Sequence, residues 1–306
     1  MKVLFFTDKE KLKKILEVTE CSRSELARLL EVRYKTIYRW LDKEVKPQER
    51  QSRDIDQLFK KYVDLRQIIY EIQKKNQNPI PRVQTDQEIR EKFILNMTYH
   101  SNAIEGSRLT IKETEQALKG ERVKGKETFE ILEAINHKNA MRHMFEVVTP
   151  GFQITKEYIL KLHEIMLYNF NDKLPGKYRN CAINLTNTNV ALASYQEVPF
   201  KMRSFIKKVN HYDDEPIGKI SRDHYEFEII HPFCDGNGRT GRLIMATQLL
   251  SQGLAPAVVR IEDRYPYYMA LEKCSFGDFN NIKQMVCDST MRGYELLELN
   301  KSSKYV

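Results

Sequence analysis

A run of twelve residues at 231–242 constrains this chain more than any other feature. It reads His-Pro-Phe-Cys-Asp-Gly-Asn-Gly-Arg-Thr-Gly-Arg, and an apolar stretch with helical character follows at 243–250. A glycine-rich turn that opens a helix presents free backbone N–H groups and the positive end of the helix dipole to an anion. The run therefore predicts a phosphate-binding loop at the beginning of a helix.

The side chains of the run add chemistry to phosphate binding. Arg239 and Arg242 supply planar, permanently charged donors for phosphate oxygens. Asp235 is a hard oxygen ligand of the kind that Mg²⁺ prefers beside a nucleotide's phosphates. His231 can take a proton near neutral pH. The combination indicates phosphate chemistry that uses a base.

This run resembles the signature of the Fic family, His-x-Phe-x-Asp/Glu-Gly-Asn-Gly-Arg-x-x-Arg, and it meets every fixed position. The resemblance extends over roughly residues 85–295 and implies an all-α core with a small β-hairpin flap. It also implies an activity: transfer of AMP from ATP to a Tyr, Thr or Ser hydroxyl of a protein, including the chain itself. ATP would be the substrate, and Mg²⁺ the cofactor.

The resemblance assigns a role to each residue of the signature. His231 would deprotonate the hydroxyl, and Asp235 would hold Mg²⁺. The nucleotide-binding residues would be Gly236, Asn237, Gly238, Arg239, Arg242 and, against the adenine, Tyr267. A protein kinase branch of the family carries Lys at the position of Gly238, so this chain favours AMP transfer.

A second motif, Ser-Asn-Ala-Ile-Glu-Gly, occupies residues 101–106. Ser101 and Glu105 are four residues apart and share one helix face, and Gly106 suits the end of that helix. The motif resembles the inhibitory motif of the Fic family, Ser/Thr-x-x-x-Glu-Gly/Asn. The resemblance implies an inhibitory helix near 86–106, N-terminal to the core, in which Glu105 pairs with Arg242.

A docking site for the target protein is expected near 181–199. Residues 181–195 contain the one convincing strand-like stretch, with Asn and Thr at its middle as in a short hairpin. This stretch and its flanks resemble the family's flap, which holds a segment of the target as an added strand. The partner expected here is therefore a protein.

The first sixty residues predict a separate helix-turn-helix domain. Residues 22–30 and 34–41 read as two short helices joined by a tight turn, similar to the modules of bacterial repressors. The inward-facing residues would be Leu26, Ala27, Leu29, Leu30, Ile37, Trp40 and Leu41. Duplex DNA would bind through residues 22–46, using Arg33, Lys35, Thr36 and Arg39. The alternative is a solvated helix face in a protein-docking domain.

The sequence then divides into three parts: the helix-turn-helix domain at 1–60, a helical linker at 61–84 and a Fic domain at 85–306. Pro79 and Pro81 mark the linker, because proline disrupts a helix interior. Capping boxes predict helix beginnings at Thr7, Ser22, Thr85 and Thr110, each followed three residues later by Glu.

Composition excludes several other classes of protein. No apolar run approaches the ~20 residues that span a bilayer, so no membrane association is expected. Five cysteines without a CxxC pair suit a reducing cytoplasm, with neither a disulfide framework nor a zinc site. His224 and His231 would lie about 10.5 Å apart along a helix, too far to share one zinc ion. A net charge of +8 favours acidic partners such as nucleotides or nucleic acid.

Two alternative functions stay open. One is a DNA-binding regulator whose Fic core only senses nucleotide, although a sensor needs neither His231 nor Asp235. The other is an enzyme that mainly removes AMP, with Glu105 orienting a water. Self-association into a homo-oligomer also stays open.

Overall fold

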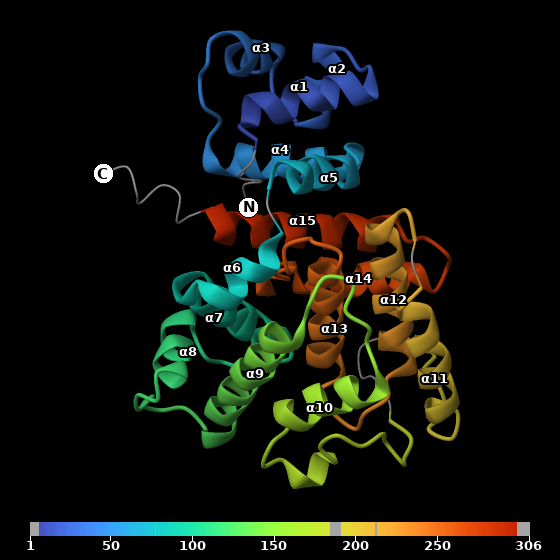
Figure 1. The fold of residues 1–306 in the computed structure, drawn as a ribbon. Helices are drawn as coiled ribbons and strands as arrows, with labels where there is room; N and C mark the ends of the chain where they lie inside the picture. Colours follow the sequence, from blue (N-terminus) through green and yellow to red (C-terminus); the bar gives the residue numbers. More distant parts are fainter. Residues whose placement is uncertain (1–5, 77, 184–190, 212, 299–306) are drawn as a thin grey trace. The chain divides into compact units, whose positions relative to one another are not determined.

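The computed structural model describes residues 6–76, 78–183, 191–211 and 213–298. Within these ranges the regular secondary structure is helical and no strand is found, which confirms the predicted all-α class. The chain forms two compact units, Met1–Glu71 and Ile72–Val306 (Figure 1). The middle of the predicted hairpin, 184–190, lies outside the described residues. The residues on either side, 181–183 and 191–194, are not strands.

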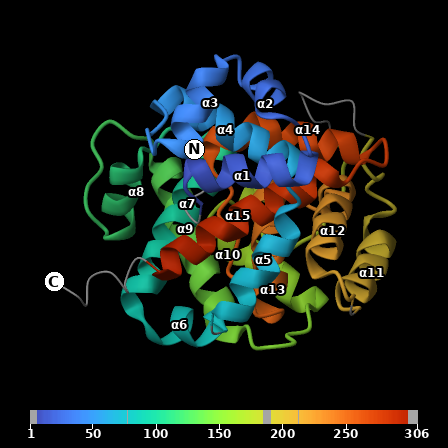
Figure 2. The ribbon, with the colours of Figure 1, turned by 90° about the horizontal axis from the view of Figure 1, so that it is seen from above.

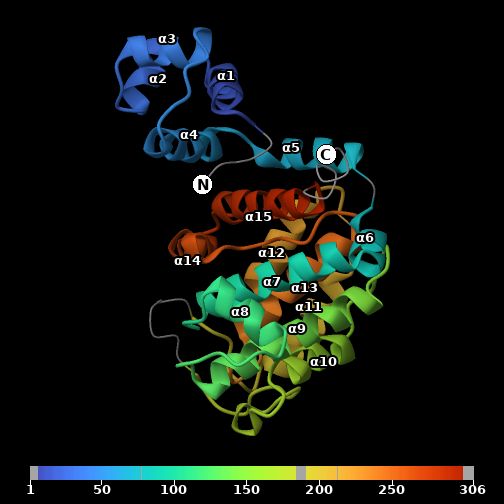
Figure 3. The ribbon, with the colours of Figure 1, turned by 90° about the vertical axis from the view of Figure 1, so that its left-hand side faces the viewer.

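The first unit consists of short helices with well-defined beginnings. Its helices are α1 (Asp8–Thr19), α2 (Arg23–Leu29), α3 (Tyr34–Asp42), α4 (Glu49–Tyr62) and the start of α5 (Leu65–Lys75). The capping boxes at Thr7 and Ser22 are confirmed, since each hydroxyl accepts a hydrogen bond from the backbone N–H three residues on. Helix α1 packs on α3 and α4, and α2 packs on α3 (Figure 3).

The two predicted short helices and the turn between them are present, as α2, residues 30–33 and α3. Of the residues expected to face inward, Leu26, Leu30 and Trp40 are buried, but Leu29 is 43% exposed. The assignment of Leu29 was wrong because Leu26 and Leu30, four residues apart, define the inner face of α2 and Leu29 points away from it. Of the four residues predicted to contact DNA, Arg33, Lys35 and Arg39 are exposed, whereas Thr36 is partly buried.

The second unit is a bundle around one central helix. Its helices are α6 (Pro79–Thr85), α7 (Gln87–Ile104), α8 (Ile111–Leu118), α9 (Thr128–Val147), α10 (Lys156–Met166), α11 (Val198–Val209), α12 (Pro216–Ile230), α13 (Asn237–Ser251), α14 (Arg264–Cys274) and α15 (Asn280–Glu298). Helix α13 runs between α9 and α12 in Figure 1 and also contacts α7 and α10. This central place explains the apolar run 243–250, whose residues are all buried.

The remaining helices enclose the bundle. Helix α15 lies across it, in contact with α7, α12 and α14 (Figure 2). Two short 3-10 helices complete the unit. η1 (Asn171–Lys173) follows α10, and η2 (Ile261–Asp263) directly precedes α14. No helix in the described ranges is long and apolar enough to cross a membrane.

Two predicted helix boundaries near residue 80 differ from the structure. Pro79 and Pro81 lie in the first turn of α6, where proline is tolerated because those N–H groups have no partner within the helix. The capping box at Thr85 is wrong: the Thr85 hydroxyl donates to Pro81 O at 2.8 Å. Asp86 caps α7 in its place, accepting from Ile89 N at 3.1 Å.

Candidate active site

The loop at 231–236 joins α12 to α13 with left-handed backbone at both ends. His231 ends α12 with φ 49°, and Gly236 precedes α13 with φ 73°. Inside the loop the Asn237 side chain is bonded to both backbone groups of Phe233. Its Oδ1 accepts from Phe233 N at 2.9 Å, and its Nδ2 donates to Phe233 O at 2.8 Å. Asn237 therefore holds the loop closed with its side chain, which leaves its backbone as the group for a phosphate.

His231 is set up as a base. Its Nδ1 lies 3.1 Å from Glu228 O, and because a carbonyl can only accept, Nδ1 must carry the proton. The lone pair is then on Nε2. Burial lowers the pKa of His231, so the imidazole is neutral near pH 7. A neutral ring with a free Nε2 can accept a proton.

A second histidine, His163 of α10, supports the loop from below. Its ring stacks on Phe233 at 3.7 Å between centroids. Its Nε2 lies 3.0 Å from Asp235 O and its Nδ1 accepts from Gly176 N at 2.9 Å. Burial lowers the pKa of His163 to about 4, which keeps the ring neutral and able to serve both contacts. Sequence reasoning missed this residue.

Arg179 also stabilises the loop, by hydrogen bonds to its backbone. Its Nε donates to His231 O at 2.8 Å and its Nη1 to Cys181 O at 3.0 Å, and Nη2 donates to Ala193 O. Its backbone N–H also donates to Pro232 O at 2.9 Å. The described ends of the predicted flap, 181 and 193, are therefore bound to the same guanidinium that holds the catalytic loop.

Asp235 offers one carboxylate oxygen for a metal. Its Oδ1 accepts from Gly236 N at 2.6 Å, whereas the nearest cation to Oδ2 is Lys173 Nζ at 3.8 Å. The side chain is 41% exposed. No group of three metal-binding side chains occurs in the described part of the chain. A single carboxylate suits Mg²⁺, which keeps waters and takes its other ligands from phosphates.

Both arginines of the signature lie near the beginning of α13 and are paired with carboxylates from other helices. Arg239 Nη1 lies 2.7 Å from Glu133 Oε1 of α9, and its Nη2 lies 3.4 Å from Asp235 Oδ1. Arg242 Nη2 donates to Glu105 Oε1 at 2.8 Å. The predicted pairing of Glu105 with the second arginine is therefore present. Glu133 was not foreseen.

Ser101 completes the grip on Arg242. The guanidinium Nε donates to Ser101 Oγ at 3.0 Å, and Nη2 donates to Ser101 O at 2.9 Å. Gly238 makes room for the carboxylate, because a Cβ on that residue would stand 2.4 Å from Glu105 Oε1. The absence of a side chain at 238 thus admits Glu105 to the beginning of α13.

Comparison with known proteins agrees with this geometry, since residues 153–249 match the Fic/DOC family. The chain contains a Fic domain. It is 29% identical over 206 residues to the protein adenylyltransferase Fic of Nematostella vectensis, covering 63% of this chain and 46% of that one. It is 30% identical over 194 residues to the protein adenylyltransferase fic-1 of Caenorhabditis briggsae, covering 62% and 38%. The chain spans less than half the length of these relatives.

Solved structures support the Fic fold. Residues 134–508 of Fic-1 from C. elegans superpose with a TM-score of 0.66 at 21% identity, covering 92% of this chain and 86% of that one. A Fic-domain signaling protein from Bacteroides thetaiotaomicron gives 0.66 at 23% identity, covering 78% and 97%. At these identities the likeness is one of fold.

Tyr267, the expected adenine contact of the Fic domain, is 1% exposed. Its hydroxyl lies 2.8 Å from His224 Nε2, and the Arg242 guanidinium carbon lies 6.0 Å from its ring centre. Burial raises the pKa of Tyr267 and lowers the pKa of His224 to about 3, so both are neutral. His224 is therefore a buried residue that is hydrogen-bonded to Tyr267.

Glu228, which the sequence did not single out, is a partly buried residue whose Oε1 atom is buried. Its Oε1 has no hydrogen-bond partner among the described residues. Burial raises the pKa of Glu228 to about 8, with Glu105 adding to the rise and Arg242 opposing it. Gly241 is required beside it, since a Cβ there would stand 2.3 Å from Oε1. Glu228 is therefore protonated near neutral pH.

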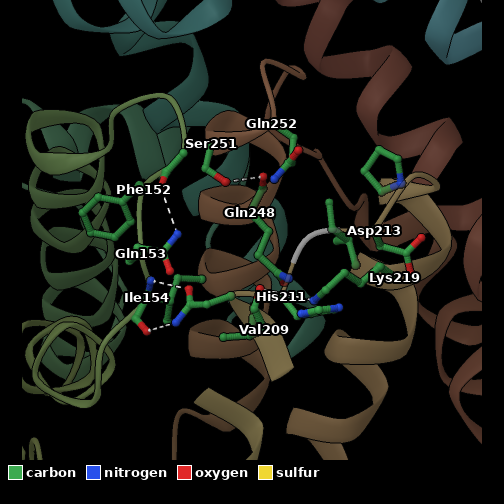
Figure 4. A pocket seen from close by; sticks show the side chains of 14 residues that line it. Phe152, Gln153, Ile154, Val209, His211, Asp213, Lys219, Gln248, Ser251 and Gln252 are labelled. Atoms are coloured by element: carbon green, nitrogen blue, oxygen red, sulfur yellow. Dashed lines mark hydrogen bonds between the residues drawn. The ribbon is translucent and has the colours of Figure 1, made fainter. Parts of the chain in front are cut away.

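A cavity of about 160 Å³ lies away from the Fic loop (Figure 4). It is lined by Phe152, Lys219, Gln248 and Ser251, among others, and by no residue of the signature. Ser251 is at the end of α13, about 21 Å from Asn237 at 1.5 Å per residue. The cavity is thus separate from the residues of the signature.

Proposed function

We propose that the chain is an autoinhibited protein adenylyltransferase, which transfers AMP from ATP to Tyr, Thr or Ser hydroxyls of a protein, itself included. The relatives named above carry the name protein adenylyltransferase. The observation that carries the proposal is the base: His231 offers an unprotonated Nε2 at the end of α12, beside a loop made for phosphates. A nucleotide sensor would need no such base.

In this reaction His231 Nε2 takes the proton of the target hydroxyl while its oxygen attacks the α-phosphorus of ATP and pyrophosphate leaves. General base help of this kind contributes typically ~10²–10⁴-fold. The amides at the beginning of α13 and the guanidinium groups of Arg239 and Arg242 would hold the phosphates. Mg²⁺, bound at Asp235, would offset the charge of the leaving pyrophosphate. The target segment would dock near 181–199.

Inhibition follows from the occupied arginine. Arg242 is 4% exposed and gives three hydrogen bonds to Ser101 and Glu105. A triphosphate that binds the Arg242 guanidinium must displace the Glu105 carboxylate, whose negative charge also repels the triphosphate. Positioning is most of phosphoryl-transfer catalysis, so a misplaced phosphate chain lowers the rate. Release of Glu105 would give the active state.

The first unit is proposed to bind duplex DNA through residues 22–46. The support is the exposed, basic outer face of α3, with Arg33, Lys35 and Arg39, and Thr36 at its partly buried edge. Lys43 lies 5.8 Å from the centre of the Tyr38 ring on the same face. Cations and an aromatic residue on an exposed second helix suit phosphates and base edges.

The test is self-modification and modification of lysate proteins with α-labelled ATP and Mg²⁺. Wild type, Glu105→Gly and Glu105→Gly with His231→Ala would be compared. Label on the first two, strongest on Glu105→Gly and missing from the double variant, supports the proposal. An AMP-loaded substrate incubated with wild type tests the reverse reaction. Release that depends on Glu105 would make AMP removal the main activity.

A further inference from the structure

Two cysteines meet beside the catalytic loop. Cys234 lies in the loop, directly before Asp235, and Cys181 lies two residues after Arg179. The Cys234 thiol lies close enough to Cys181 and to the backbone of Asn180 for both to influence it electrostatically. We propose that Cys181 and Cys234 form a reversible disulfide, a modification site that fixes the segment at 181 to the catalytic loop.

The backbone brings the segments that contain the two cysteines together. Arg179 N donates to Pro232 O at 2.9 Å, so residues 179 and 232 are neighbours. Cys181 and Cys234 each follow their neighbour by two positions. The Arg179 side chain binds both segments as well, at His231 O (2.8 Å) and Cys181 O (3.0 Å). A disulfide would bring the two sulfurs to the S–S length of about 2.05 Å.

The other three cysteines are either less accessible or remote in sequence from this pair. Cys181 is exposed and Cys234 is partly exposed, whereas Cys274 and Cys287 are buried. Cys21 belongs to the first unit and is remote in sequence. The Arg179 guanidinium interacts electrostatically with both sulfurs of the pair. An exposed cysteine with a second cysteine nearby in the fold can be oxidised to a sulfenic acid and then to a disulfide.

The chemistry balances with a peroxide as the oxidant. The Cys181 sulfur attacks one oxygen of hydrogen peroxide, the O–O bond breaks, and the second oxygen leaves as water after taking a proton. The sulfenic acid is then attacked by the Cys234 sulfur, and its S–O bond breaks to release a second water. Two thiols are oxidised to one disulfide as the peroxide is reduced to two waters. A dithiol reverses the bond by exchange.

The disulfide would restrict the site where the target is expected. It ties the first residue of the proposed docking segment to the residue before Asp235, so this segment and the loop could no longer move apart. We therefore expect oxidation to lower AMP transfer to a protein target, and reduction to restore it. This consequence depends on the proposed function, whereas formation of the disulfide does not.

The experiment treats the full-length chain with hydrogen peroxide, followed by thiol titration, intact mass and peptide mapping. We expect the free thiols to fall from the five in the sequence to three, with a loss of two hydrogens and a cross-linked peptide containing Cys181 and Cys234. Cys181→Ser should block the loss of the pair, and Cys21→Ser is the matched control that should not. Because Cys181 is exposed, its serine variant should fold, as circular dichroism can verify.

The outcomes separate the two proposals. Five free thiols after treatment, or a sulfinic acid on Cys181 while Cys234 stays reduced, would overturn the disulfide. A cross-link between any other pair would overturn it too. If the disulfide forms in a chain that never transfers AMP, the modification site stands and the proposed function fails. If it forms without changing transfer by the active Glu105→Gly variant, the regulatory consequence is refuted.

Discussion

Glu228 makes the stability of the Fic domain depend on pH in a way that one substitution should remove. Burial raises the pKa of Glu228 to about 8 from an ordinary value of 4.5. Between these values the folded state holds a proton that the unfolded state has released. The contribution of protonated Glu228 to the free energy of unfolding is therefore fully present below pH 4.5 and is lost as the pH rises through 8. Glu228→Gln keeps the shape of the neutral carboxyl but cannot ionise when the protein unfolds.

The magnitude follows from the slope of proton linkage. One proton contributes about 1.4 kcal/mol per pH unit, so between about pH 5.5 and 7.5 wild type should lose up to ~2.7 kcal/mol relative to Glu228→Gln. For a domain of this size, 1 kcal/mol corresponds to roughly 2–4 °C in Tm. The difference in Tm between Glu228→Gln and wild type should therefore grow by about 5–10 °C over that interval. The Tm is the unfolding midpoint of the Fic unit, measured by differential scanning calorimetry.

A matched control lies on the same helix. Glu226 pairs with Lys208 at 2.8 Å at the surface of α12, so Glu226→Gln should give a curve parallel to wild type. Parallel curves for Glu228→Gln as well would show that Glu228 is ionised in the folded protein. The assignment of a proton to Glu228, and the account of the polar cluster around Arg242, would then be wrong.

Four further outcomes are expected. His231→Ala should abolish AMP transfer while ATP binding, followed by calorimetry, stays within a few-fold; transfer near the wild-type rate would remove His231 from the mechanism. Glu105→Gly should raise self-labelling by about five- to 150-fold, the range of a 1–3 kcal/mol shift in population; equal labelling would contradict inhibition. Lys35→Ala and Arg39→Ala should each lower the slope of log K against log[salt] for duplex DNA by about 1, measured by anisotropy, and unchanged slopes would make the module a protein-docking domain. Gly238→Ala should destabilise wild type, because its Cβ would stand 2.4 Å from Glu105 Oε1, but should cost less in Glu105→Gly, where only the 3.0 Å approach to Arg242 Nη1 remains and alanine's helix propensity opposes it; equal shifts in Tm would disprove the contact with Glu105.

The parts of the site that the sequence revealed are those encoded by short spacing. The twelve residues at 231–242 form one loop and one helix beginning, so local pattern was enough. Ser101 and Glu105 share a helix face, and the resemblance to an inhibitory motif supplied their partner, Arg242, 141 and 137 residues away. Without that resemblance the pair would have been an ordinary surface serine and glutamate.

The supporting residues could not be found in this way. His163 contacts a loop residue 72 positions later, and Glu133 pairs with Arg239 across 106 positions. A histidine and a glutamate on amphipathic helices look alike whether they face solvent or a catalytic loop, because only the packing of α9 and α10 on α13 decides it. The predicted N-cap of α7 was wrong for a local reason. Thr85 and Asp86 are adjacent, and both residue types are good N-caps.

Because Arg239 and Arg242 are both paired with carboxylates, a nucleotide that binds them would have to replace an existing ion pair. Each guanidinium is almost fully buried, and each is neutralised by a carboxylate from a different helix, Glu133 of α9 or Glu105 of α7. Removing a carboxylate without replacing it would leave a buried positive charge, which is strongly unfavourable. In the proposed function a triphosphate would supply that replacement, so its binding and the release of Glu105 would be one exchange of anions on Arg242. Glu105 is the partner suited to leave, because it stands at the end of α7 and is 32% exposed, whereas Glu133 is 20% exposed and lies within α9.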